Sequence, residues 1–254
     1  MIKSYTYKLL RSPLLYISIF GIAALCFSNF IDDRFGYATV SYHVQRFLDL
    51  AQYRNCVILL GALPFAANFA DEWNSGITKE CIVRKGVKKY AVQNVLICWL
   101  SSFIAVFLGL WLFMCIDSLF VPWSDVSPNP SYTIFEEYLH NGQGEIWLFF
   151  ASVIYASSCA AWAVMGMLVS VLFPNKFVAI CMPLITCYFF LRITRMAPNW
   201  VNLHNISVSN FPYEYFNSHF MGFLYCVGIY AAIAAVCGMI FCRVLKRKVQ
   251  NGVT

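Results

Sequence analysis

The sequence predicts an all-α integral membrane protein with six transmembrane helices. The first observation is composition: charged residues make up 12% and hydrophobic residues 60% of the 254 residues, whereas soluble proteins contain ~25% charged residues. The second is that the apolar residues fall in long runs without charge. The third is that Lys and Arg are unevenly divided among the connections between those runs. A soluble enzyme is excluded, because a chain of this length in water needs far more charge to cover its surface.

Six apolar runs are long enough, or nearly so, to cross a hydrocarbon core ~30 Å thick as helices of about 17 to 25 residues. None of the six contains Asp, Glu, Lys, Arg or His. The second and fifth have only 15 residues each, so polar flanks or neighbouring helices must complete their crossing. Continuous apolar runs also argue against a β-barrel, whose strands alternate apolar and polar residues. The predicted spans are residues 13–30, 56–70, 91–116, 146–173, 177–191 and 220–241.

The basic residues predict the orientation of these spans. Six spans place both termini on one side, and 13 of the 18 Lys and Arg, including every Lys, lie on that side. Nine of the 12 acids lie on the other side. Because positive charge is retained in the cytoplasm, we expect both termini to be cytoplasmic. The net charge of +6 then reflects topology and does not indicate a nucleic-acid partner.

Residues 1–12 precede the first span. Lys3, Lys8 and Arg11 are mixed with Tyr and Leu, which is typical of an amphipathic helix on the inner membrane surface. Simple basic flanking of the first span is the alternative. No small-residue cleavage site follows an apolar core of the right length, so we do not expect a signal peptide.

The sequence lacks the residue patterns of catalysis and metal binding. It has no His-Glu-x-x-His, Gly-x-Ser-x-Gly or Cys-x-x-Cys motif and no Gly-x-x-x-x-Gly-Lys-Ser/Thr phosphate-binding loop. Glu136 and Glu137 near His140 are the nearest approach to a carboxylate–histidine cluster, and loop acids are ordinarily solvated. The uncharged spans also argue against a carrier driven by protons or sodium. We predict no enzyme activity, no bound cofactor and no metal.

The connection between the second and third spans, residues 68–96, is the only sizeable internal cytoplasmic segment. Asp71 and Glu72 stand at the C-terminal end of the second span, where the helix dipole and anionic lipids disfavour an acid. We therefore expect these acids to have partners. Gly76 permits a tight turn, and Thr78 is a candidate cap for a short helix after it.

This short helix is predicted to be amphipathic. Its apolar residues, on or near one face, are Ile77, Ile82, Val83 and Val87. Its basic residues, largely on the other face, are Lys79, Arg84, Lys85, Lys88 and Lys89. Such a helix can pack on the membrane surface, or it can insert its apolar side into a groove on a partner protein.

Glu72 at the end of the second span, Gly76 four residues later and the basic stretch from Arg84 to Lys89 resemble the membrane subunits of type-two ABC exporters. The start, MIKSYTYKLLRSP, and the predicted topology extend the resemblance over the whole chain. The connection from Asp117 to Glu145 departs from it, because the corresponding connection is brief in many family members.

The resemblance implies a single permease domain over residues 1–254, in the plasma membrane of a bacterium. It implies a dimer with a second permease subunit, identical or similar, surrounded by membrane lipid. The helix after Gly76 would be a coupling helix on a separate ATP-binding cassette subunit, which holds the ATP and Mg. The coupling residues would be Glu72, Gly76, Ile77, Thr78, Ile82, Val83, Arg84 and Lys85.

The second and fifth spans are short, contain Pro64 and Pro183, and occupy matching places in two halves of three spans. Short Pro-interrupted spans mark the pathway in secondary carriers, and in the resembled family these two spans line the central route. For each candidate, packing within the protein or against lipid is the alternative. The candidate pathway residues are Leu59, Pro64, Phe65, Asn68, Phe69, Met182, Pro183, Phe189 and Phe190, with Tyr188 beside them.

The outer segment 192–219 is rich in aromatic residues and Pro. In the resembled family this region folds into two short helices that gate the outer leaflet. A general preference of such aromatics for the membrane interface is the alternative.

The sequence therefore predicts the permease subunit of an ATP-driven exporter. An uncharged aromatic lining favours an amphiphilic cargo, such as an antimicrobial peptide or a hydrophobic drug, over an ion. Three other classes stay open: a carrier or channel that needs no ATPase, an intramembrane enzyme, and a non-transporting scaffold or sensor.

Overall fold

The computed structural model describes residues 11–31, 39–124, 135–208, 216 and 218–251, and these residues form helices and no strand. Four helices are long and apolar enough to cross a membrane. They are α7 (Val87–Asp117), α9 (Gly144–Leu172), α10 (Lys176–Thr194) and α12 (His219–Gln250). The predicted surface helix over residues 1–12 lies almost wholly outside the described residues.

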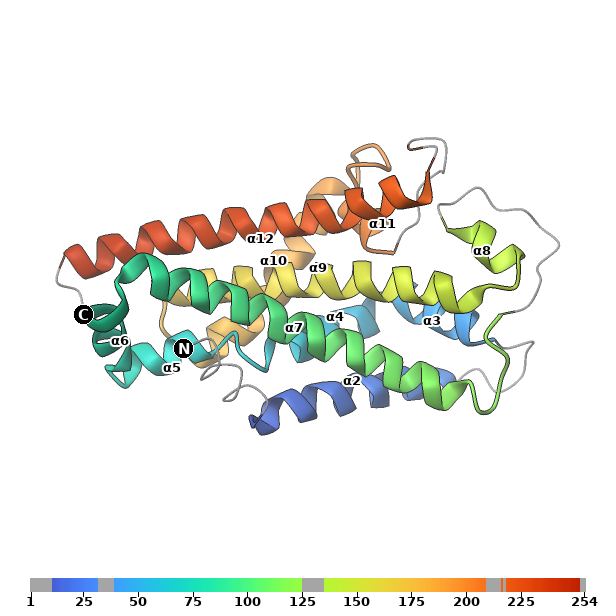
Figure 1. The fold of residues 1–254 in the computed structure, drawn as a ribbon, viewed down its shortest axis with the longest axis horizontal. Helices are drawn as coiled ribbons and strands as arrows, with labels where there is room; N and C mark the ends of the chain where they lie inside the picture. Colours follow the sequence, from blue (N-terminus) through green and yellow to red (C-terminus); the bar gives the residue numbers. More distant parts are fainter. Residues whose placement is uncertain (1–10, 32–38, 125–134, 209–215, 217, 252–254) are drawn as a thin grey trace.

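Figure 1 shows a bundle of roughly parallel long helices with short helices at both ends. One end, here called the α6 end, carries α5 (Asn68–Asn74) and α6 (Ile77–Lys85) beside the last turns of α12. The opposite end, here called the α3 end, carries α3 (Val40–Asp49) and α8 (Glu136–His140), with α11 (Leu203–Ser207) toward the same side. The bundle is completed by α2 (Pro13–Ile31) and α4 (Ala51–Ala62).

Helix α9 is the centre of the bundle and packs against α4, α7, α10 and α12. Its buried residues include many Ala and Ser, which let neighbouring backbones approach as they do in membrane-helix interfaces. The closest approach is at Gly166, where a Cβ atom would lie 2.5 Å from the Ala179 carbonyl oxygen and 2.5 Å from Pro183 Cγ. Glycine at this position therefore allows α10 to lie directly on α9.

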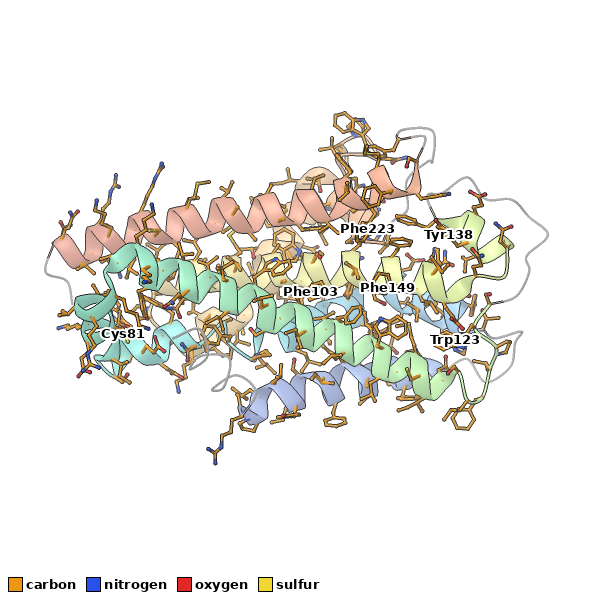
Figure 2. All side chains as sticks on the ribbon, viewed as in Figure 1. Cys81, Phe103, Trp123, Tyr138, Phe149 and Phe223 are labelled. Atoms are coloured by element: carbon orange, nitrogen blue, oxygen red, sulfur yellow. The ribbon has the colours of Figure 1, made fainter. Side chains whose placement is uncertain are left out.

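An aromatic column runs along α7 at intervals of four residues. Trp99 stacks on Phe103 and Phe103 on Phe107, with ring centroids 5.3 and 5.8 Å apart. Phe149 of α9 meets Phe107 edge-on at 6.2 Å. Figure 2 shows Phe103 and Phe149 between the long helices, with Phe223 of α12 nearby. The α7 rings are half-buried and Phe149 is exposed, so this column covers the outer edge of the α7–α9 contact with apolar surface.

The second predicted span, residues 56–70, does not form one regular helix. Helix α4 ends at Ala62, the chain turns over residues 63–67, and α5 begins at Asn68. The cause is Pro64, which has no N–H for the Leu60 carbonyl and whose ring clashes with that carbonyl. The Leu60 carbonyl instead accepts hydrogen bonds from Leu63 N–H, at 3.2 Å, and from the hydroxyl of Ser18 on α2.

The fifth predicted span is longer than the sequence indicated. The predicted span covers residues 177–191 and stops at the charged residues on either side. Helix α10 runs for 19 residues and includes both of these, Lys176 and Arg192. Pro183 lies inside this helix without ending it, and its ring packs closely on Gly166 of α9. Crossing length and composition are thus shown for four of the six predicted spans, and the second differs from its prediction.

Gly166→Ala is expected to lower the free energy of unfolding by about 1 to 3 kcal/mol, because the added methyl group would overlap α10 backbone and proline atoms. Gly228→Ala on α12 is the matched control, since a Cβ there meets nothing within 4 Å. Thermal unfolding of both variants in the same detergent gives the comparison. Equal stability of Gly166→Ala and wild type would contradict the tight α9–α10 contact.

Candidate functional site

The chain between α5 and α7 is an elbow bounded by two glycines. Gly76 has φ 77° and Gly86 has φ 79°, a backbone region that favours glycine. A short helix follows Gly76, as predicted, and ends at Lys85. The residue that caps this helix is Gly76 itself, so the prediction that Thr78 caps it is wrong. Thr78 is instead buried, with its hydroxyl 3.4 Å from that of Tyr90.

Glu72 is buried at the inner side of this elbow and is only 4% exposed. The Tyr90 hydroxyl donates a hydrogen bond to Oε2 of Glu72 at 2.7 Å, and Nδ2 of Asn68 donates to Oε1 at 2.9 Å. The expectation that this acid has partners is confirmed, and these partners belong to the same chain. Because Tyr90 is on α7 and Asn68 on α5, the carboxylate connects the broken second span to the third.

Asp71, the neighbouring acid, faces the other side of α5. Its carboxylate lies 2.8 Å from Nζ of Lys176, the first residue of α10. One turn later, Nδ2 of Asn74 donates to the Pro174 carbonyl at 3.0 Å. An exposed ion pair contributes little by itself. Together with the amide bond, however, it fixes α5 against the turn that joins α9 to α10.

The C-terminal part of α12 contacts both α5 and the end of α9. Nζ of Lys248 donates to the Leu172 carbonyl at 3.4 Å and lies 5.4 Å from the ring centre of Trp73. Phe69 of α5 meets Phe241 edge-on, with ring centroids 5.2 Å apart. Helix α5 therefore contacts four long helices, α7, α9, α10 and α12, at the α6 end.

Helix α6 does not present one continuous apolar face. Ile82 is 9% exposed and lies on the buried side with Thr78, four residues earlier. Ile77 is 47% and Val83 86% exposed. The prediction that Ile77, Ile82 and Val83 lie on or near one face is wrong, because successive residues of a helix are 100° apart and only the side with Ile82 packs against the bundle. Arg84 is exposed and Lys85 half-buried. Cys81 marks the position of α6 in Figure 2.

The candidate pathway residues divide into two groups. Pro64, Phe65, Phe69 and Pro183 are buried within the chain, and Leu59, Asn68 and Met182 are half-buried. Phe189 and Phe190 lie on the exposed surface of α10, where the Phe190 ring is 5.9 Å from that of Trp162. The structure therefore does not bring all of these residues to one cavity of the single chain.

Some partnerships at the α3 end were not predicted. His43 Nδ1 lies 2.8 Å from Asp117 Oδ2, and both side chains are 1% exposed. Glu137, considered above with His140, lies instead 2.8 Å from Nε2 of His219. Sequence spacing holds no signal for either pair, because the partners are 74 and 82 residues apart. Among the described residues no three His, Cys, Asp or Glu gather as metal ligands.

A polar pocket of about 570 Å³ also opens between α4, α10 and α11. Nη1 of Arg54 donates to Nδ1 of His204 at 2.8 Å, so this nitrogen is unprotonated. Partial burial, together with Arg54 and Arg195, lowers the pKa of His204 to about 4. In the sequence, one feature indicates this pocket: Arg54, Arg192 and Arg195 are three of the five basic residues on the predicted outer side.

Comparisons of the chain with protein-family models, with curated proteins and with solved structures find no match. Four long apolar helices give the described bundle the character of a multi-pass membrane protein. Its polar interactions gather at the two ends of the bundle, and at the α6 end they join α5 to α7 and α10.

Tyr90→Phe is expected to lower the free energy of unfolding by about 1 to 3 kcal/mol, because the buried Glu72 carboxylate loses a donor. Tyr42→Phe is the control, since Tyr42 is exposed on α3. Thermal unfolding at neutral pH measures both. If Tyr90→Phe unfolds at the wild-type temperature, the Glu72 contact does not stabilise the elbow.

Acidification should destabilise the protein through His204. An unfolded His titrates near pH 6.5, whereas the folded pKa is about 4. Between these values the unfolded chain binds a proton that the folded chain does not, so stability is complete above pH 6.5 and falls toward pH 4. After allowance for partial exposure, the loss at pH 5 is about 1 kcal/mol. His204→Gln should remove this part of the pH dependence of thermal unfolding, and an unchanged pH profile would contradict the assignment.

Proposed function

We propose that the chain is the membrane permease subunit of an ATP-driven exporter, and that α6 receives movement from a separate ATP-binding cassette subunit. One observation carries the proposal. A short helix with exposed Ile77 and Val83 projects from an elbow whose buried side is held by Glu72. Apolar side chains at the polar end of a membrane bundle favour contact with another protein.

The contacts of α5 provide a path for such movement. A push on α6 reaches α5 through the short turn at Gly76 and through the shared contacts of Thr78, Tyr90 and Glu72. From α5 it reaches the first turn of α10 through Asp71 and Lys176. The irregular residues 63–67 separate α5 from α4, so α5 can tilt without carrying all of α4 with it.

The surface of α10 supports an amphiphilic cargo and a second permease subunit. Its exposed apolar residues include Ile185, Phe189 and Ile193. A neighbouring groove of about 420 Å³ between α9, α10 and α12 is lined by apolar side chains, among them Trp162 and Met165. In the proposed dimer this side of α10 faces the partner, and cargo such as an antimicrobial peptide or a hydrophobic drug passes between the subunits.

Val83→Asp is expected to reduce recovery of the ATP-binding subunit about tenfold when the chain is purified from its native cell, because a charge replaces an exposed apolar contact. Val83 is preferred to Ile82, whose burial would make Ile82→Asp a folding mutation. Leu119→Asp is the matched control, since Leu119 is exposed beyond the end of α7, far from α6. Mass spectrometry identifies and quantifies the copurified protein.

The same preparation tests transmission. Glu72→Gln should retain the ATP-binding subunit but lower the cargo transported per ATP hydrolysed in reconstituted vesicles. Absence of any ATP-binding protein from the wild-type preparation would refute the exporter and favour a carrier, channel, scaffold or sensor. Wild-type recovery for Val83→Asp together with wild-type coupling for Glu72→Gln would remove α5 and α6 as the transmission element.

A further inference from the structure

The pocket between α4, α10 and α11 concentrates positive charge outside the proposed coupling site. Arg54, Arg192 and Arg195 all line it, and among its described lining residues Asp49 supplies the one carboxylate. His204 contributes no positive charge near neutral pH, because its Nδ1 accepts a hydrogen bond from Arg54. Three guanidinium groups beside one another repel, and an anion between them offsets that repulsion.

Arg54 has a donor that the fold leaves unused. Its Nε is buried and has no hydrogen-bond partner among the described residues, although Nη1 is bound to His204. A buried donor without an acceptor is costly, so a shift of the Arg54 side chain that brings this N–H onto a ligand oxygen in the pocket would be favourable. Arg192 and Arg195 are exposed, and their side chains remain free to close on a ligand in the pocket. One guanidinium group can donate two parallel hydrogen bonds to two oxygens of the same phosphate group.

The position of the pocket indicates which anion reaches it. Arg192 lies in the last turn of α10, a helix that is long and apolar enough to cross a membrane. On the same helix, Tyr188 lines the pocket and is 65% exposed, and Ile185 one turn earlier is also exposed. Trp200, exposed just beyond α10, is a residue type that favours the headgroup level. A ligand in this pocket therefore has an apolar surface directly beside its charged end.

We propose that this pocket binds the phosphate headgroup of an anionic membrane phospholipid, with the acyl chains along the exposed face of α10. The three arginines hold the phosphate oxygens, and the amides of Asn55 and Asn202 border the remaining headgroup. The site goes beyond the proposed transport function and requires neither cargo nor ATP. Its occupancy would stabilise α11 against α4 and α10 at this end of the bundle.

The test uses the full chain, purified in a neutral detergent and free of added phosphate. Phosphatidylglycerol, phosphatidylcholine and inorganic phosphate are added separately, and binding is followed by thermal unfolding and by native mass spectrometry. Arg192→Gln combined with Arg195→Gln is compared with Lys246→Gln combined with Arg247→Gln. Both pairs remove two exposed cations, and the control pair lies on α12 at the opposite end.

Phosphatidylglycerol should raise the unfolding temperature of the wild type and of the α12 control, whereas phosphatidylcholine should have little effect. The α10 double variant should bind phosphatidylglycerol at least about tenfold more weakly, because charge-assisted hydrogen bonds are lost. If it is unstable without lipid, Arg195→Gln alone gives the same comparison with a smaller effect.

Wild-type affinity in the α10 variants would overturn the site. Equal stabilisation by inorganic phosphate would assign the pocket to a soluble phosphate compound and overturn the lipid assignment. Neither result depends on an ATPase, so the coupling proposal is tested separately.

Discussion

Two prolines in apolar segments, Pro64 between α4 and α5 and Pro183 within α10, impose the constraint on which the bundle depends. Each proline removes an N–H from its helix, and the freed carbonyl must be satisfied where water is scarce. At Pro64 the Leu60 carbonyl turns to Leu63 N–H and to the Ser18 hydroxyl, which draws α2 onto α4. At Pro183 the corresponding carbonyl belongs to Ala179, and Gly166 of α9 allows its oxygen to approach closely. Proline thus ends helix α4 at position 64, whereas at position 183 it lies in the contact between α10 and the central helix α9.

The break at Pro64 also determines what stands at the α6 end. If the second span continued as one straight helix, Asn68 and Glu72 would be carried onward in its direction. The turn over residues 63–67 instead starts a new helix, which places these residues beside Tyr90. A buried carboxylate is tolerated there because amide and hydroxyl donors surround it. The elbow is consequently held by polar contacts that depend on precise helix positions, and the movement proposed for α6 would act directly on these contacts.

The sequence predicted the long helices well, because uninterrupted apolar runs leave few alternatives to a membrane span. It also predicted the turn at Gly76 and partners for Asp71 and Glu72. It could not predict that Lys176 pairs with Asp71, because that contact depends on how α9 and α10 pack. The prediction of how Ile82 and Val83 are oriented was wrong for a related reason. Both residues are apolar, and the positions of α5 and α7 determine which side of α6 is covered.

The two ends of the bundle differ in how their charged side chains are paired within the chain. At the α6 end, Asp71 is held by a lysine, and Glu72 by a tyrosine and one side-chain amide of the chain itself. At the other, three arginines share a pocket in which Asp49 is the one carboxylate among the described lining residues, so those residues leave a net positive charge there. Between the ends, the predicted spans contain no ionisable Asp, Glu, Lys, Arg or His through which proton or ion binding could be coupled to movement. In the exporter proposed above, energy from the ATP-binding subunit would enter at one end of the bundle, and the elbow at α5 and α6 connects an exposed surface at that end to the long helices.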